Sequence, residues 1–310
     1  MEITRRKVLQ ALGLGFGAVA VGGIGAAASL YLNNTKNRSP PIIQSANGEN
    51  LVLCDLHCHP SINRTLEDKM EMLGSPGLVG LTERSGPAGI LTYHDAVQEL
   101  HSHPDFKELT PGKMAKFKEG YFVRTAEVHG GFLDFIAIDF DGEESFSNQD
   151  SPLTVIQDIR ERNGLVVLST PYSVKDGVGF RVANAEEEPI ITETCRLSDF
   201  VEVHDSYNID LLWYGLKESN RAATKLQQSG CGANDPVLPF ASSDGHRELG
   251  HCKLTGLYVA EDNLKNAGTF RSALESGDYY LAGNAKDGPY TSRGEFVRSM
   301  ILPKLLPFLK

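Results

Sequence analysis

The sequence has few cysteines and fewer basic than acidic residues, and each shortage excludes a class of protein. Its five cysteines are an odd number without a Cys-x-x-Cys pair, which argues against a disulfide framework and against a zinc ribbon. A Cys231–Cys252 disulfide stays open if the chain lies outside the cell. Lysine and arginine number 30 against 40 aspartates and glutamates, so the formal net charge is -10. Broad nucleic-acid binding needs a basic surface, and we do not expect it here.

The N-terminus carries a long run without charged residues, from Val8 to Leu32, directly after the basic cluster Arg5-Arg6-Lys7. This pattern resembles a twin-arginine translocation signal, which exports proteins that have already folded. The resemblance implies the Tat translocase as a partner and a final location in the periplasm or at the cell surface. Because the run is long enough to span a bilayer, membrane anchoring by the N-terminal segment and cleavage of the segment both stay open.

The chain divides into three parts by composition. Residues 1–32 form the signal or membrane anchor. Residues 33–50 are polar, contain Pro40-Pro41 and predict a linker. Residues 51–310 are long enough for one large domain with a C-terminal tail.

Strand patterns alternate with helix patterns after residue 50, which predicts an α/β domain with a mainly parallel sheet. A hairpin is expected from 121–128 and 132–140, joined by the turn His129-Gly130-Gly131. The polar residues 174–189 predict a loop. The other expected strands are 51–56, 78–82, 165–170, 200–204 and 238–242, and the expected helices are 66–73, 93–101, 152–162, 210–228 and 269–276.

The first expected strand ends in His57-Cys58-His59. Residues i and i+2 of a strand point to the same face, so His57 and His59 project side by side while Cys58 points away. Two neutral imidazoles on one face supply half of the ligands of a divalent metal site. The sequence therefore predicts a metal centre at the end of this strand.

Other acidic residues and histidines also lie at the ends of apolar strands. In an α/β barrel the active site is assembled from such strand ends at one mouth of the barrel. This distribution predicts one shared site rather than scattered polar positions. The residues concerned are Glu83, Glu127, Glu202, His204, Asp244 and His246.

The order of these residues resembles the PHP family of polymerase and histidinol phosphatase domains. His57 and His59 match the first motif, Glu127 matches the strand glutamate that usually bridges two metals, and Asp244 with His246 matches the final Asp-x-His. The resemblance implies a distorted (β/α)7 barrel of PHP type. It also implies hydrolysis of phosphomonoesters or phosphodiesters by metal-activated water.

The sequence departs from the family pattern at four places. It has Thr82-Glu83-Arg84 where Thr-Asp-His is usual, Thr170-Pro171 where His-Pro is frequent, and Asp134 where a ligand histidine is common. An acidic residue expected shortly after the first motif is absent, with Asn63-Arg64 in that neighbourhood. The remaining residues suffice for one good metal site, and Glu83 or Asp134 could supply part of a second. The resemblance thus implies one to three divalent ions, among Mn, Zn, Mg and Fe. Oxygen-rich replacements suit Mn²⁺ or Mg²⁺ better than Zn²⁺.

The expected roles follow from side-chain chemistry. A guanidinium binds phosphate bidentately and keeps its charge, so Arg84 and Arg247 are candidates for substrate binding, with an ion pair to Glu83 or another acid as the alternative for Arg84. His246 either completes the metal cluster or acts as a general acid. Glu202 is either a further ligand or a buried structural acceptor, and His204 a supporting group. The expected metal ligands are His57, His59, Glu127, Asp244 and His246, with Glu83, Asp134, Glu202 and His204 as a second tier.

Three functions compete at this point. The first is an exported metal-dependent phosphoesterase acting on a small phosphorylated substrate. The second is a degenerate PHP-like protein that binds a metal or ligand without catalysis, which the altered positions Arg84 and Thr170 favour. The third is an amidohydrolase-type metallohydrolase, which ranks last because no suitable lysine follows a mid-barrel strand.

Overall fold

The computed structural model describes residues 40–84, 89–176, 179–205, 216–232, 237–247, 252–253 and 255–282. The predicted N-terminal signal and the C-terminal tail lie outside the described residues, as do the side chains of His246 and Arg247. Within the described residues, no helix combines the length and the apolar character needed to cross a membrane.

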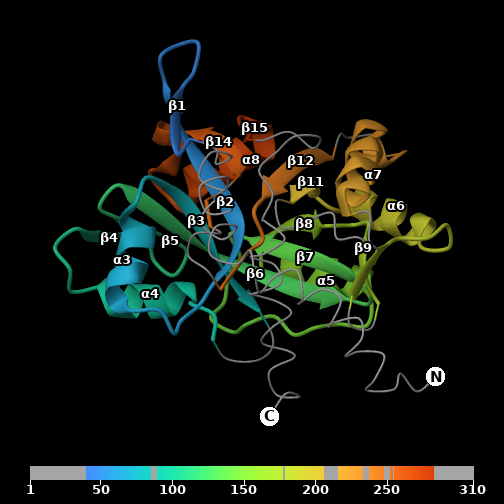
Figure 1. The fold of residues 1–310 in the computed structure, drawn as a ribbon, viewed down its shortest axis with the longest axis horizontal. Helices are drawn as coiled ribbons and strands as arrows, with labels where there is room; N and C mark the ends of the chain where they lie inside the picture. Colours follow the sequence, from blue (N-terminus) through green and yellow to red (C-terminus); the bar gives the residue numbers. More distant parts are fainter. Residues whose placement is uncertain are drawn as a thin grey trace, which may run out of the picture. The chain divides into compact units, whose positions relative to one another are not determined.

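A 13-stranded mixed sheet forms the centre of the fold (Figure 1). Its main path runs in the order β12-β11-β8-β7-β6-β3-β2-β14-β15. These strands are β2 (Asn50–Pro60), β3 (Gly77–Arg84), β6 (Gly120–Gly130), β7 (Leu133–Ile138), β8 (Leu165–Ser169), β11 (Phe200–Asp205), β12 (Leu238–Ser242), β14 (Gly256–Ala260) and β15 (Tyr280–Ala282).

The sheet is mixed, and the prediction of a mainly parallel sheet was wrong in this respect. Strands β2, β3 and β6 are parallel neighbours, and so are β8, β11 and β12. Between these groups β7 runs antiparallel to both β6 and β8, because the predicted hairpin inserts its return strand there. The six strands β2, β3, β6, β8, β11 and β12 consequently all end at the same edge of the sheet.

The sheet closes almost completely into a barrel. After β12 the chain turns at Ser243-Asp244 and enters β13 (Gly245–Arg247), which pairs in parallel with β2 in the register His246 with His59. Strand β12 also lies close to β2 and β14. The expected distorted α/β barrel is confirmed, and its closing turn carries one of the predicted metal ligands.

Helices surround the sheet (Figure 1). Helices α3, α4, α5 and α8 match the predicted helices to within a few residues. Helix α7 matches in the part that the structure describes, and α6 was not predicted. The caps fit the sequence: Thr92 forms a capping box with Asp95 at the start of α4, and Thr65 caps α3. The helices are α3 (Leu66–Gly74), α4 (Tyr93–Leu100), α5 (Pro152–Glu161), α6 (Glu188–Leu197), α7 (Leu216–Gln228) and α8 (Ala267–Ser276), with the 3-10 helices η1 (Gly230–Gly232) and η3 (Glu261–Leu264).

Two segments that the sequence assigned to linker or loop contain strands. Within 33–50, β1 (Ile42–Gln44) pairs antiparallel with β2. Within 174–189, β9 (Ser173–Asp176) pairs with β10 (Gly179–Val182) in a separate two-stranded sheet. A third antiparallel pair, β4 (Phe106–Thr110) with β5 (Met114–Phe117), extends the main sheet beside β6. These strands are only three to five residues long, and runs this short show little of the alternation by which a sequence indicates a strand.

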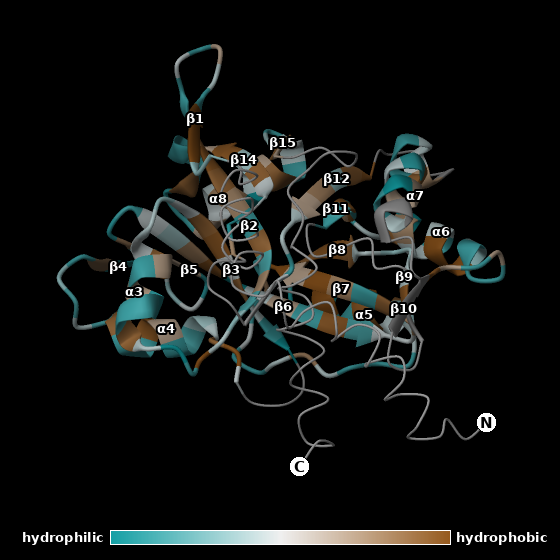
Figure 2. Ribbon diagram, in the orientation of Figure 1, coloured by the Kyte–Doolittle hydropathy of each residue, from teal (hydrophilic) through white to brown (hydrophobic). Residues whose placement is uncertain are grey.

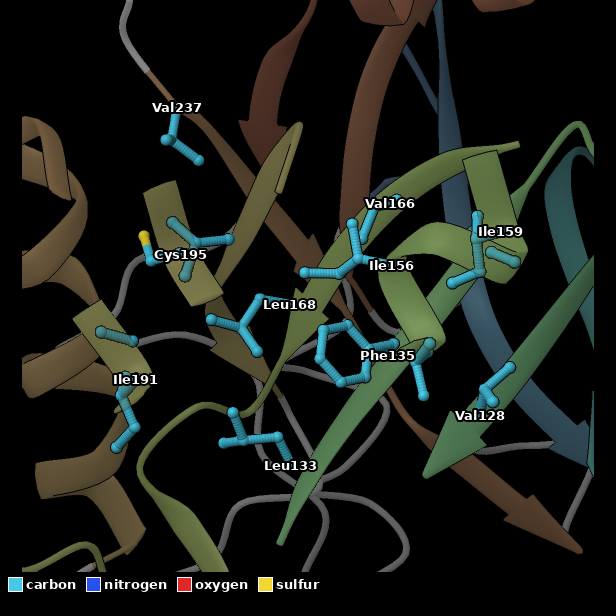
Figure 3. Close-up of a cluster of buried hydrophobic side chains, with 14 of the residues drawn as sticks. Val128, Leu133, Phe135, Ile156, Ile159, Val166, Leu168, Ile191, Cys195 and Val237 are labelled. Carbon is cyan, nitrogen blue, oxygen red and sulfur yellow. The ribbon is translucent and has the colours of Figure 1, made fainter. Parts of the chain in front are cut away.

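Neighbouring residues of each strand enter different cores, as the two-residue period requires. Phe135 and Leu168 pack with Ile156 of α5 on the outer face of the sheet (Figure 3). Ile136, which follows Phe135, and Val167, which precedes Leu168, belong to a separate apolar cluster. Figure 2 shows hydrophobic residues concentrated on the strands, while α7 is largely hydrophilic. The strand residues in phase with Ile136 are therefore the ones that face the barrel interior.

A disulfide joins Cys195 of α6 to Cys231 of η1, with their Cα atoms 5.9 Å apart. The Cys231–Cys252 pairing considered from the sequence is thus wrong. Cys54, Cys58 and Cys252 are free and buried. The disulfide fixes the end of α7 against α6, on the side of the barrel away from α3 and α4 (Figure 1).

Candidate metal centre

The two histidines of β2 lie side by side at the edge where the parallel strands end. Both are buried, and their ring centroids are 5.1 Å apart. Nδ1 of His59 lies 3.1 Å from the carbonyl oxygen of Thr82, which can only accept. In the neutral ring Nδ1 therefore carries the hydrogen, and Nε2 keeps the lone pair that a metal needs. Cys58 points to the opposite face, as alternation predicts, where its thiol donates to Asp55 Oδ2 over 3.1 Å.

Asp244 reaches both histidines from the closing turn of the barrel. Its Oδ1 lies 3.3 Å from His57 Nε2 and 3.8 Å from His59 Nε2. One ligand atom from each of these three residues lies within 4.8 Å of the others. Asp244 has a φ of 44°, a left-handed conformation that aspartate tolerates better than most residues. The predicted association of His57, His59 and Asp244 is present in the structure.

Asp55 fixes this turn, and sequence reasoning missed it. Its carboxylate accepts hydrogen bonds from the backbone N–H of Ser243 (3.0 Å), the hydroxyl of Ser243, and the backbone N–H of Lys253 (2.7 Å). Burial raises the pKa of Asp55 to about 6, against the opposing effect of these donors. A single aspartate inside an apolar strand was the available signal, because a fully buried carboxylate needs several donors.

Glu127 of β6 lies on the other side of His59. Its Oε2 is 3.3 Å from His59 Nε2 and 3.2 Å from Arg84 Nε. Burial alone would raise the pKa of Glu127, but His59, Arg84 and His57 hold it well below its usual range. Glu127 is therefore a carboxylate. It lies between His59 of the first group and Arg84, and its role as a glutamate that bridges two metals stays a prediction.

Glu202 of β11 lies beside His57 and is itself fixed by three hydrogen bonds. Ser169 Oγ (2.7 Å), the backbone N–H of Thr170 (3.1 Å) and the hydroxyl of Ser242 all donate to its carboxylate. Its Oε1 lies 3.9 Å from His57 Nδ1, an ion-pair distance too long for a hydrogen bond. The structural-acceptor interpretation of Glu202 fits these contacts better than a role as a metal ligand.

The electrostatic state of His57 follows from these carboxylates. Burial lowers the pKa of His57, but Asp244, Glu202 and Glu127 outweigh it and raise the pKa to about 10. The metal-free site thus attracts positive charge strongly. A proton satisfies it in part, and a divalent cation would satisfy it more fully.

A second group of possible ligands comprises Glu127, His129 and Asp134, again with ligand atoms within 4.8 Å of one another. His129 Nδ1 and Asp134 Oδ1 form a short hydrogen bond across the β6–β7 pair, where the two residues are direct partners. Arg84 Nη2 lies 3.5 Å from His129 Nε2. The sequence predicts a turn at His129-Gly130-Gly131, but strand β6 continues through His129 to Gly130.

Glu83, predicted as a second-tier ligand, is not part of the site. It adjoins Arg84 on β3 and so points to the opposite face, where it forms a bidentate ion pair with Arg124 (2.8 and 3.1 Å). His204 is buried on β11, two residues beyond Glu202. For His246 and Arg247 only the backbone is described, in β13 beside His59 and Pro60.

The donor set fits a divalent metal ion. Both ring nitrogens of His57 and Oε2 of Glu127 are buried atoms without a hydrogen-bond partner among the described residues. Such atoms are costly unless something binds them. Glu127 Oε2 already faces the Arg84 guanidinium at 3.2 Å, whereas the ring nitrogens of His57 face carboxylates, and a divalent cation is the partner that would bind histidine and carboxylates together. Imidazole nitrogens combined with carboxylate oxygens suit Mn²⁺, Fe²⁺ or Zn²⁺. His57, His59 and Asp244 would hold the ion, with Glu127 at its edge.

The sequence matches no family model. It also matches no curated protein. Among solved structures, this chain is similar to a two-domain protein from Bacteroides vulgatus ATCC 8482 that contains a predicted PHP-like metal-dependent phosphoesterase. The match covers 79% of this chain and 69% of that protein, with 12% sequence identity and a TM-score of 0.45.

Two further structures are endonucleases. Endonuclease Q in complex with a 27-mer duplex carrying an abasic lesion gives 13% identity and a TM-score of 0.45 over 84% of this chain and 67% of its own. The lesion-specific endonuclease PfuEndoQ from Pyrococcus furiosus has 14% sequence identity and a TM-score of 0.42, and the match covers 74% of this chain and 57% of the endonuclease. At these identities and TM-scores, the chemistry of the site has to be derived from this chain's own residues.

Proposed function

We propose that this protein is a metal-dependent phosphoesterase that hydrolyses a phosphomonoester or phosphodiester. The observation that supports the proposal most is the group of two buried histidines, His57 and His59, whose Nε2 atoms lie 3.3 and 3.8 Å from Asp244 Oδ1. Arg84 lies nearby, with its Nε 3.2 Å from Glu127, the residue that adjoins His59. A divalent ion bound there would lower the pKa of a water molecule and neutralise a phosphoryl oxygen. That combination of ion and fixed guanidinium is suited to phosphoryl groups.

The chain's own residues would bind and orient the substrate. Arg84 is 26% exposed, with its Nε 3.2 Å from Glu127 and its Nη2 3.5 Å from His129, so its other N–H groups can donate to phosphoryl oxygens. Arg247 is the proposed second phosphate contact, and His246 the proposed proton donor to the leaving oxygen. Both follow the closing turn in β13, at the same edge as His59. Glu202 and Asp55 would hold His57 and the turn in place.

We further propose export by the Tat translocase, with a periplasmic or surface location and a small phosphorylated substrate. The twin arginine Arg5-Arg6 supports this, and the Cys195–Cys231 disulfide adds to it because disulfides persist mainly in oxidising compartments. The net charge of -10 favours a small substrate over broad nucleic-acid binding. Fractionation of cells that express the full-length chain tests this location: protein in the periplasmic fraction supports export with removal of the N-terminal segment, protein in the membrane fraction supports anchoring, and protein confined to the cytoplasm contradicts export.

Metal content and turnover of the full-length protein test the proposed activity together. Elemental analysis of protein loaded with Mn²⁺ is combined with assays on chromogenic phosphate monoesters and diesters. His57→Ala and Asp244→Asn are compared with His101→Ala, a matched control because His101 is exposed at the end of α4. We expect bound metal and turnover in the wild type and in the control, and loss of both in the two site variants.

Two other results have definite meanings. Turnover that survives in His57→Ala contradicts the proposed mechanism. Stoichiometric metal without turnover on either ester class contradicts the enzyme and favours the alternative, a PHP-like metal-binding protein without catalysis. Circular dichroism of each variant separates loss of the site from loss of the fold.

A further inference from the structure

The second group of ligand-type residues resembles a metal site in its composition. Glu127, His129 and Asp134 bring two carboxylates and an imidazole within 4.8 Å. Their positions follow from the strands: Glu127 and His129 are two residues apart on β6, and Asp134 on β7 is the direct partner of His129. All three therefore share the inner face of the sheet. Glu127 also lies 3.3 Å from His59 Nε2, so this group adjoins the first one.

A cation of the chain itself lies against this group. Arg84 Nε is 3.2 Å from Glu127 Oε2, and Arg84 Nη2 is 3.5 Å from His129 Nε2. Two of the three potential ligands thus already face a guanidinium. Arginine keeps its charge at every pH that a protein survives, so a divalent ion here would meet a permanent positive charge at contact distance.

Asp134 and His129 hold that guanidinium in place. Asp134 accepts the hydrogen bond from His129 Nδ1, because a carboxylate has no hydrogen to give. The neutral ring then presents the lone pair of Nε2, which is the atom facing Arg84. The order of contacts is Asp134, His129, Arg84 and Glu127. Each residue orients the next, so the guanidinium of Arg84 lies against the carboxylate of Glu127. Glu127 also adjoins His59 of the first metal site.

We infer that Arg84 occupies the second cation position of this centre, so that the chain binds one divalent ion where its ligand-type residues would otherwise bind two. The inference rests on the proposed metal site at His57, His59 and Asp244 and specifies its stoichiometry. One side of a bound phosphoryl group would face the ion, and the other would face a fixed guanidinium. His129 and Asp134 are positioning residues for Arg84.

Metal stoichiometry in the full-length protein tests this directly. Equilibrium dialysis against Mn²⁺, followed by elemental analysis, should give about one equivalent per chain in the wild type and about two in Arg84→Ala, where the second group is released. Arg84→Lys retains the charge and should stay at about one. Adding His129→Ala to Arg84→Ala removes a ligand of the new site and should return the value to about one. Arg84→Met provides a second neutral variant if Arg84→Ala does not fold.

The outcomes separate this inference from the proposed function. Two equivalents in the wild type, or one in a folded Arg84→Ala protein, overturn the inference and leave the first metal site standing. No bound metal in any variant overturns the first site and the inference with it. A second readout concerns the positioning role: His129→Ala should raise KM for a phosphoester more than it lowers kcat, with the Mn²⁺ stoichiometry unchanged, and loss of metal in that variant would contradict the assignment.

Discussion

Replacing Arg124 by methionine should cost about 3–5 kcal/mol of unfolding free energy, because it leaves a buried carboxylate without its partner. The side chains of Arg124 and Glu83 are only 4% and 6% exposed, and they form two hydrogen bonds of 2.8 and 3.1 Å. Arg124 also donates to the carbonyl oxygens of Gly142 and Glu143 and lies 4.5 Å from the ring centroid of Phe140. Methionine keeps part of the ring contact but none of these hydrogen bonds.

The measurement is thermal and urea unfolding of the metal-free protein in EDTA, so that metal binding does not affect the comparison. For a domain of this size, 1 kcal/mol corresponds to about 2–4 °C in Tm, and the expected decrease is roughly 6–20 °C. In Arg124→Met/Glu83→Gln the buried charge is gone. The double variant should therefore be more stable than Arg124→Met alone, which a double-mutant cycle quantifies.

The same variants decide the role of Glu83. Because it faces away from His57 and His59, Glu83→Gln should keep the Mn²⁺ stoichiometry of the wild type while its Tm falls. A loss below about 1 kcal/mol in Arg124→Met would refute the reasoning on the buried pair. Loss of metal from a folded Glu83→Gln protein would refute the assignment of Glu83 to the outer face.

Three other predictions follow from the described contacts. Glu202→Gln removes the negative charge 3.9 Å from His57 and should weaken Mn²⁺ binding about 10–100-fold in titration calorimetry, and an unchanged Kd would contradict the supporting role of Glu202. In the metal-free protein Asp244 and Glu202 outweigh burial and raise the pKa of His57 to about 10, so metal binding at neutral pH displaces a proton. The Mn²⁺ affinity should therefore rise about tenfold per pH unit from pH 7 to pH 9. An affinity that does not change with pH would exclude this competition between the proton and the metal. Cys195→Ser opens a disulfide with a sequence separation of 36 residues and should cost about 4 kcal/mol in urea unfolding, whereas equal stability with and without reductant in the wild type would show that the bond does not form.

The sequence brought candidate metal ligands together correctly where a local pattern determines the geometry. His57 and His59 share a face because they are two residues apart on a strand, and Asp244 follows a strand that ends at the same edge of the barrel. The fold class was accessible for the same reason, since strand and helix patterns alternate along most of the chain. The antiparallel position of β7 follows from the predicted hairpin, because the return strand of a hairpin runs antiparallel to the first.

The predictions from sequence were wrong where the outcome depends on which face of the sheet a strand residue occupies, or on contacts between segments far apart in the sequence. Glu83 and Arg84 are adjacent, so only one can face the site, and pairing of Arg84 with Glu127 on β6 selects Arg84. The spacing Glu127-x-His129 repeats the logic of His-x-His and would have revealed His129 if the strand had been extended by two residues. The partner of Cys195 depends on how α6 and η1 meet in space, and spacing alone does not encode that.

The position of the metal itself tests the central claim most directly. Crystals of the full-length protein soaked in Mn²⁺ and measured near the manganese absorption edge should show one anomalous peak per chain, at bonding distance from His57 Nε2, His59 Nε2 and an oxygen of Asp244. No peak there, or a peak confined to Glu127, His129 and Asp134, would contradict both the assigned ligands and the role of Arg84.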